Sequence, residues 1–140
     1  MTAAEPSDST ADLFVGAMRS LRRRWADAAS PFGLTPHQVR ALRVIGRGPL
    51  RPGELAEELR VAPRSVTDVV DGLEAAGLLE RQPDATDRRA VLLELTPHGS
   101  EVLTRVSAAR DLASDAWLAR LSESDQEELN RLLLLLADND

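Results

Sequence analysis

Apolar residues recur at helical spacing along most of the chain. Between residues 11 and 29, Phe14, Met18, Leu21 and Trp25 stand three or four positions apart, which places them on one face of a helix. The same spacing returns in later segments, so that the pattern predicts six helices. Their predicted ranges are 11–29, 36–45, 52–60, 63–76, 97–119 and a last helix that follows Ser122.

Residues that start and stop helices mark the ends of these segments. Thr35 is a side-chain N-cap, Pro36 suits the first helical position, and Gln38 completes a capping box. Gly77 is a natural C-terminal cap for the helix that Pro63 opens. The helices are therefore predicted by their ends as well as by their apolar faces.

After residue 77 the pattern changes from helical spacing to alternation. Residues 78–82 are one strand candidate, and residues 90–95, where every second residue is Val or Leu, are the other. Residues 83–89 between them are polar and rich in turn-forming residues. We therefore predict a β-hairpin with a long charged tip, which we call the wing.

The order of these elements predicts a fold. A helix, a short helix at residues 52–60, a tight turn, a helix at residues 63–76 and a hairpin form a winged helix-turn-helix. The inner face of the second helix of the turn would be its apolar stripe, Val66, Val69, Val70 and Leu73. The predicted fold is mostly α with a small β-wing.

Composition removes several function classes. The chain has 140 residues without cysteine, lysine or tyrosine, and all 17 basic residues are arginine. Disulfides, thiolate zinc sites, thiol-oxidation switches, Schiff-base chemistry and Gly-Lys phosphate loops are therefore excluded. Two histidines fall short of a zinc site unless carboxylates join them, and no nucleophile–base pair is evident. We expect no metal, no cofactor and no enzyme activity.

The polar N-terminal residues and the hydropathy of the chain predict a cytoplasmic protein. No apolar run approaches the ~20 residues that a membrane span needs. Residues 1–10 are polar, which predicts a disordered tail and not a secretory signal.

The formal net charge of −6 is distributed unevenly. Residues 1–34 have four arginines and four acidic residues, residues 35–98 have nine and ten, and residues 99–140 have four and nine. The surplus of acid therefore lies in the C-terminal third. An acidic chain can still bind DNA where its arginines gather on one face, although the balance disfavours indiscriminate coating of DNA.

The second helix of such a turn enters the major groove with its N-terminal side chains against base edges. Here the outward residues are Arg64, Ser65, Thr67 and Asp68. Arg64 suits guanine O6 and N7, and Asp68 can accept from cytosine N4. Ser65 and Thr67 suit phosphates or bases.

The wing tip holds Asp87, Arg88 and Arg89. Arginine is attracted to the narrow minor groove of A·T-rich DNA, so we expect one of the two arginines there. The pattern leaves open which one. We expect Asp87 to orient one of them through a charged hydrogen bond.

Several motifs, taken in order, resemble the multiple-antibiotic-resistance-regulator (MarR) family. The resemblance covers about residues 11–137, and its wing signature is Asp-x-Arg followed by Leu-Thr and Gly. The motifs are LAEEL at 55–59, SVT at 65–67, DGLEAAGLLER at 71–81, DRR at 87–89 and LTPHG at 95–99. Asp68 and Ala62 depart from the family pattern, since relatives often have a basic or neutral residue and a capping Ser or Thr there.

The resemblance implies a homodimer that binds double-stranded DNA at a palindromic operator. A dimerisation helix at 11–33 and further dimerisation helices at 99–140 would flank a DNA-binding domain at 34–98. The apolar stripes outside that domain support this independently, because they would otherwise stay partly exposed. The dimerisation residues are expected to be Phe14, Met18, Leu21, Leu129, Leu132, Leu133 and Leu136.

The resemblance also implies a regulator, most often a repressor that a small lipophilic or aromatic effector releases. Trp25, His37 and Trp117 are candidates for the effector pocket, against defaults of apolar packing for the tryptophans and an exposed surface position for His37. The competing hypothesis is a winged-helix module for protein–protein contact without a DNA role. The sequence leaves open the operator, the effector, and repression as opposed to activation.

Overall fold

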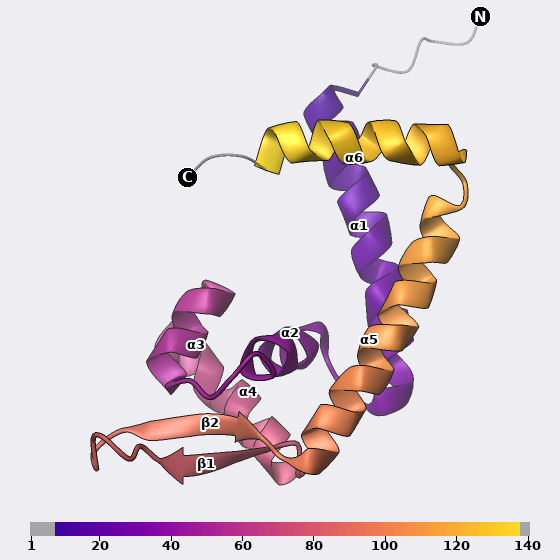
Figure 1. Cartoon of the computed structure of the whole chain (residues 1–140). Coiled ribbons are helices and arrows are strands. Elements are labelled where there is room, and N and C mark those ends of the chain that lie inside the picture. Colours follow the sequence, from indigo (N-terminus) through magenta and orange to yellow (C-terminus); the bar gives the residue numbers. More distant parts are fainter. Residues whose placement is uncertain (1–7, 138–140) are drawn as a thin grey trace, which may run out of the picture.

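The computed structural model describes residues 8–137, and within them it has the six helices and the hairpin that the pattern predicts. Figure 1 shows two lobes, with α1, α5 and α6 forming the upper one and α2 to α4 with the wing forming the lower one. The elements are α1 Thr10–Ala29, the 3-10 turn η1 Ser30–Phe32, α2 Pro36–Ile45, α3 Pro52–Leu59, α4 Pro63–Ala75, β1 Leu79–Pro83, β2 Val91–Leu95, α5 Pro97–Leu118 and α6 Glu123–Ala137.

The helices begin at capping residues. The backbone N–H of Gln38 donates to Thr35 Oγ1 over 3.2 Å and the N–H of Thr35 donates to Gln38 Oε1 over 2.9 Å, which confirms the capping box. The hydroxyl of Ser9 accepts from the N–H of Asp12, so α1 begins at Thr10, one residue before the apolar pattern does. Of the tail predicted for residues 1–10, residues 1–7 lie outside the described residues.

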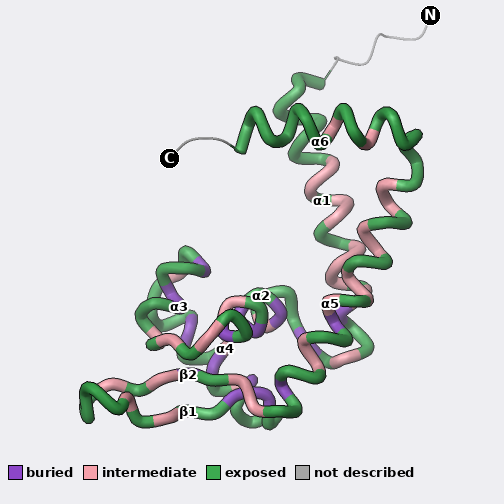
Figure 2. Tube along the Cα trace, viewed as in Figure 1, coloured by how far each residue is buried: buried purple, intermediate pink, exposed green. Residues whose placement is uncertain are grey.

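The apolar core fills the lower lobe (Figure 2). Val66, Val70 and Leu73 of the predicted stripe are buried on the inner side of α4, and Val69 is half-buried. They pack with the fully buried leucines of the neighbouring elements, which are Leu42, Leu55, Leu79 and Leu93. Burial of this stripe positions the opposite face of α4 toward solvent.

The wing is an antiparallel pair whose register runs from Leu79 opposite Leu95 to Pro83 opposite Val91. The first strand starts one residue later than predicted, because the backbone of Leu78 is used by the preceding turn. Its N–H donates to Leu73 O over 2.9 Å, next to Gly77 in the left-handed conformation at φ 76°.

In the upper lobe α1 packs against α5, and each helix contributes a tryptophan. Trp25 Nε1 donates to Ser114 Oγ over 2.8 Å, and Trp117 Nε1 donates to Ser20 Oγ over 3.2 Å. Both indole N–H groups are therefore satisfied inside one chain. Both tryptophans therefore lie in the contact between α1 and α5.

The last helix, α6, buries none of its residues (Figure 2). Of the residues expected at the dimer interface, Met18, Leu21 and Leu129 are half-buried, whereas Phe14 is 49% exposed and Leu136 76%. The remaining large apolar side chains exposed on α1 and α6 are Leu13, Val15, Leu132, Leu133, Leu134 and Leu135. Apolar side chains exposed together on α1 and on the C-terminal half of α6 need a partner surface.

The two lobes are joined where α5 begins. Thr96 Oγ1 donates to Gly77 O over 2.6 Å and accepts from the N–H of Gly99 over 2.9 Å, while the Thr96 N–H donates to Leu78 O. A β-carbon added to Gly99 would lie 1.8 Å from Leu78 O. Glycine is therefore required for α5 to approach this turn.

We expect Gly99→Ala to lower the free energy of unfolding by about 3 kcal/mol or more, because the clashing atom is a backbone carbonyl that cannot rotate away. Urea denaturation at a fixed protein concentration measures the change. Gly53→Ala is the matched control, since nothing lies within 4 Å of its added β-carbon and alanine favours a helix. Equal stability of the two variants would contradict the close approach.

Candidate nucleic-acid interface and ligand cavity

The outward face of α4 is formed by its first two turns. Arg64, Ser65, Thr67 and Asp68 are all exposed there, opposite the buried valines. Among residues 8–137, no ion pair engages Arg64 or Asp68. Their charged groups are therefore available to a ligand. Helix α4 starts at Pro63 without a side-chain cap, as Ala62 predicts.

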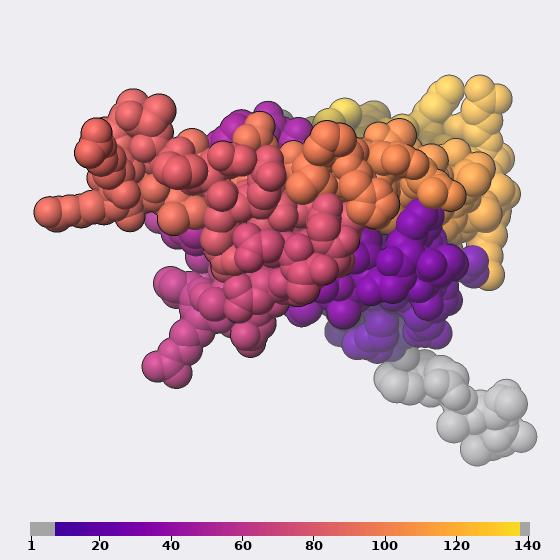
Figure 3. Space-filling view, turned by 90° about the horizontal axis from the view of Figure 1, so that it is seen from below, coloured from indigo at the N-terminus to yellow at the C-terminus, as the bar shows by residue number. Residues whose placement is uncertain are grey.

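The wing tip presents Arg88 and Arg89, both exposed, in the turn between β1 and β2. Figure 3, seen from below, shows the wing projecting beyond the body of the molecule. Asp87 makes a hydrogen bond to one of these arginines through the backbone of that residue. Its carboxylate accepts from the backbone N–H of Arg89 over 3.0 Å and not from a guanidinium. Asp87 therefore stabilises the turn, and its carboxylate does not restrain the guanidinium group of Arg88 or Arg89.

Arg81 fastens the start of the wing to α4. Its guanidinium donates to Asp71 over 2.7 Å and also contacts Glu74. The hydrogen bond to Asp71 is the main reason that the pKa of Arg81 is raised above its usual value. Helical spacing and turn signals do not predict this link, because its partners lie 7 and 10 residues away on a different element.

A cavity of about 500 Å³ lies between α1, α2 and α5, where the two lobes meet. Trp25 and His37, two of the three pocket candidates, line it. The third, Trp117, does not, because its indole is turned toward Ser20 on α1. The cavity wall is completed by Arg22, Ala26, Ala29, Pro36, Val39, Arg40, Val106 and Arg110.

This cavity combines an aromatic wall with positive charge. The Arg110 guanidinium lies 3.8 Å from the centre of the Trp25 ring, and Arg22 and Arg40 add two more cations from α1 and α2. No carboxylate is among the lining residues. The lining therefore suits a small aromatic anion. The sequence pattern did not predict these arginines as pocket residues, because they come from three different helices.

Arg40 connects the cavity to the helix-turn-helix. Besides lining the cavity, it donates through Nη2 to Leu59 O over 3.2 Å. Leu59 is the last residue of α3, and Arg60 after it has the left-handed conformation at φ 54°. A ligand that draws the Arg40 side chain away would remove a hydrogen bond from the turn before α4.

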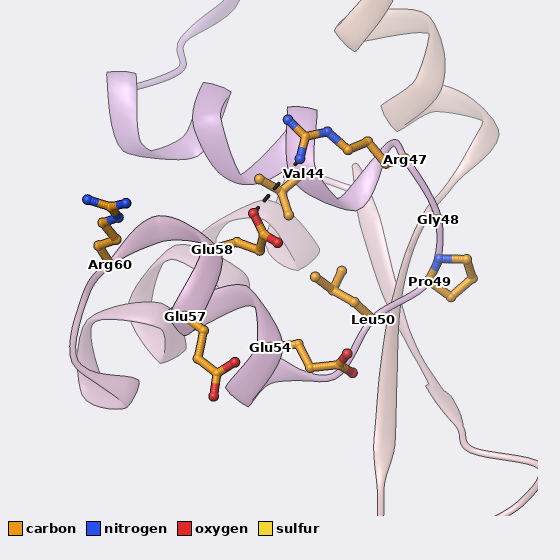
Figure 4. Close-up of a pocket in the computed structure, with 9 residues that line it drawn as sticks. All are labelled: Val44, Arg47, Gly48, Pro49, Leu50, Glu54, Glu57, Glu58 and Arg60. Carbon is orange, nitrogen blue, oxygen red and sulfur yellow. Dashed lines mark ion pairs between the residues drawn. The ribbon is translucent and has the colours of Figure 1, made fainter. Parts of the chain in front are cut away.

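A second, open groove of about 640 Å³ lies between the end of α2, the 46–50 loop and α3 (Figure 4). Its lining includes Glu54, Glu57 and Glu58 beside Arg47 and Arg60, with Arg47 Nη1 3.9 Å from Glu58 Oε2. Carboxylates repel phosphate, so this groove is poorly suited to a nucleic-acid backbone.

Two further observations concern residues 8–137 alone. They hold no group of three or more His, Asp or Glu residues that could bind a metal ion. None of their helices has the length and apolarity to cross a membrane.

Comparison with known proteins gives consistent matches. The MarR family profile matches residues 32–90. The HTH-type transcriptional repressor Rv2887 of Mycobacterium tuberculosis is 34% identical over 120 residues, which is 85% of each chain.

Solved structures match over nearly the whole length. Rv2887 in complex with DNA superposes with a TM-score of 0.80 at 29% identity, covering 94% of this chain and 100% of the other. Rv2887 in complex with p-aminosalicylic acid gives 0.77 at 30% identity with the same coverage. Wild-type MarR of E. coli in its apo form gives 0.85 at 23% identity, covering 95% and 100%, which shows a shared fold.

Proposed function

The chain belongs to the MarR family of helix-turn-helix transcriptional regulators, which are not enzymes, and on this premise we propose that it is a homodimeric repressor. It acts in the cytoplasm on a palindromic operator in double-stranded DNA. Each protomer places α4 in a major groove and its wing tip in the adjacent minor groove, at half-sites ~34–36 Å apart.

The proposal rests on two exposed groups of residues, one on α4 and one at the wing tip, whose charged side chains form no ion pair among residues 8–137. Arg64 and Asp68 lie opposite a buried stripe, and Arg88 and Arg89 lie at the end of a projecting hairpin. The charge of the whole chain is −6, so affinity has to come from these local arginines. The relative Rv2887 is named a repressor and has been solved with DNA, which supports the same function here.

The exposed leucines of α6 support the homodimer. Leu132 and Leu133 are 43% and 37% exposed on the predicted stripe, and the described residues of the same chain bury none of α6. A second copy would cover them together with Phe14 of α1. Dimerisation also sets the distance between the two α4 helices, on which recognition of a palindrome depends.

The cavity between α1, α2 and α5 supports release by an effector. Its arginines and Trp25 suit an aromatic carboxylate, and Rv2887 has been solved with p-aminosalicylic acid and with salicylic acid. An effector seated there competes for Arg40, which supports the turn between α3 and α4. Occupancy would thereby favour α4 positions that do not match the operator.

We expect Arg88→Ala/Arg89→Ala to weaken operator binding at least about tenfold, and to reduce the slope of log affinity against log salt by about 1 to 2. Fluorescence anisotropy at several salt concentrations, with DNA flanking the gene, measures both. Arg120→Ala is the control, because this exposed arginine follows the C-terminal end of α5, whereas the wing precedes its N-terminal end. If the wild type binds this DNA no tighter than random DNA, and selection from random sequences gives no preferred site either, the protein-contact module is favoured instead.

We expect Leu133→Arg to raise the dimer dissociation constant by at least about tenfold, because the charge would be buried without a partner. Sedimentation equilibrium measures the constant. Glu127→Arg introduces the same side chain on the opposite face of α6 and should leave the dimer intact. A Leu133→Arg protein that stays dimeric would contradict this interface.

With sodium salicylate as the probe, we expect quenching of Trp25 fluorescence and a fall in operator affinity. Arg110→Ala should weaken salicylate binding about tenfold, since it removes the cation over the Trp25 ring. Arg105→Ala is the matched control. This arginine is also on α5 and lies over Phe32 at 5.8 Å, outside the cavity lining. Equal losses in both variants would place the ligand elsewhere.

A further inference from the structure

The wing is joined to the rest of the lower lobe mainly at its base. Leu79 and Leu93 are buried in the core, and Leu50 pairs with Leu93 through two backbone hydrogen bonds of 2.8 and 3.2 Å. Beyond these residues the hairpin extends away from the core toward its exposed tip. The direction in which the tip points therefore depends on contacts that the hairpin makes with the rest of the lower lobe between its base and Arg88.

An ion pair between Arg51 and Asp84 is such a contact. The Arg51 guanidinium donates to Asp84 Oδ2 over 2.8 Å, and joins the N-cap position of α3 to the first residue after β1. We call this ion pair the strap. The two residues are 33 positions apart and join the wing to α3, the first helix of the helix-turn-helix, which packs against α4.

Both carboxylate oxygens and the backbone N–H of Asp84 form hydrogen bonds. Its Oδ1 accepts from the N–H of Thr86 over 2.9 Å and from the Thr86 hydroxyl over 2.8 Å, and its own N–H donates to Ala90 O over 3.1 Å. These bonds fix the start of the wing turn. A displacement of the Asp84 side chain would therefore also displace the turn that presents Arg88 and Arg89.

The strap also differs from other ion pairs of the surface. The Asp84 side chain is 10% exposed, whereas in the pair of Arg47 with Glu58 the side chains are 71% and 56% exposed at 3.9 Å. Hydrogen bonds from Thr86 and then from Arg51 lower the pKa of Asp84 to about 2, and the bond to Asp84 raises the pKa of Arg51. The pair thus stays charged at every pH at which the protein would function.

We propose that Arg51 and Asp84 are positioning residues for DNA binding, which hold the wing at the angle where its tip and α4 contact the operator together. This inference rests on the proposed function, and it assigns the two residues a role through Arg88 and Arg89. The Arg51 side chain is 46% exposed, and an ion pair whose cation remains in contact with water contributes little to stability. The strap therefore acts on the orientation of the wing more than on the stability of the fold.

A double-mutant cycle on operator affinity tests this. Asp84→Asn keeps the size of the side chain and an acceptor for Thr86, and Arg51→Ala removes the donor. We expect about tenfold weaker binding for each variant and about the same loss, not a hundredfold one, for both together. A loss confined to Arg51→Ala would make Arg51 a direct phosphate ligand and overturn the strap.

The same substitution in a protein without the wing arginines tests whether Asp84 acts on DNA binding through them. In Arg88→Ala/Arg89→Ala protein, Asp84→Asn should cause no further loss, since the contacts that it positions are already absent. A full additional loss there would overturn the proposal. Glu58→Gln, which breaks the more exposed pair with Arg47, is the control and should bind as the wild type does.

A measurement without DNA separates this proposal from the proposed function. Trypsin cuts after exposed arginines, so cleavage after Arg88 and Arg89, followed by mass spectrometry, reports the freedom of the tip. We expect several-fold faster cleavage in Asp84→Asn with an unchanged melting temperature, and no change in Glu58→Gln. Unchanged cleavage in Asp84→Asn would overturn the strap even where wild-type DNA binding is as proposed. Failure of wild-type binding alone would overturn only the function.

Discussion

The approach of α5 to the turn between α4 and β1 is the constraint on which the two lobes depend. Thr96 closes this turn with its hydroxyl and backbone, and Gly99 leaves no side chain where Leu78 O passes. The long helix therefore leaves the wing at one defined angle. Because α5 also packs on α1, that angle carries over to the helices that would form the dimer.

The cavity lies beside this joint, and its position has a physical consequence. It is lined from both lobes, by α1 and α5 of the upper one and α2 of the lower one. A ligand there touches the groups that set the relation of the lobes, among them Arg40 with its bond to Leu59 O. The wing lies at the other end of the lower lobe and has its own attachments, through Arg81 to α4 and through Arg51 to α3.

Local signals predicted the elements well. Thr35 with Gln38, Pro63 and Gly77 define helix ends through bonds or dihedral limits that span few residues, so they are readable from the chain. The valine stripe of α4 followed in the same way from helical spacing. The predicted boundaries differ by one residue at α1, α3, α4, α5, β1 and β2. At α1 and β1, Ser9 and the backbone of Leu78 decided the boundary.

The sequence by itself determined the order of elements, the exposed face of α4 and the arginines of the wing tip, because caps, periodicity and turn chemistry act over short separations. Only the tertiary structure decided which distant side chains meet. Arg22, Arg40 and Arg110 gather around Trp25 from three helices, Trp117 turns away, and Asp84 reaches Arg51 across 33 residues. Such contacts depend on how helices cross, and no spacing along one helix encodes them.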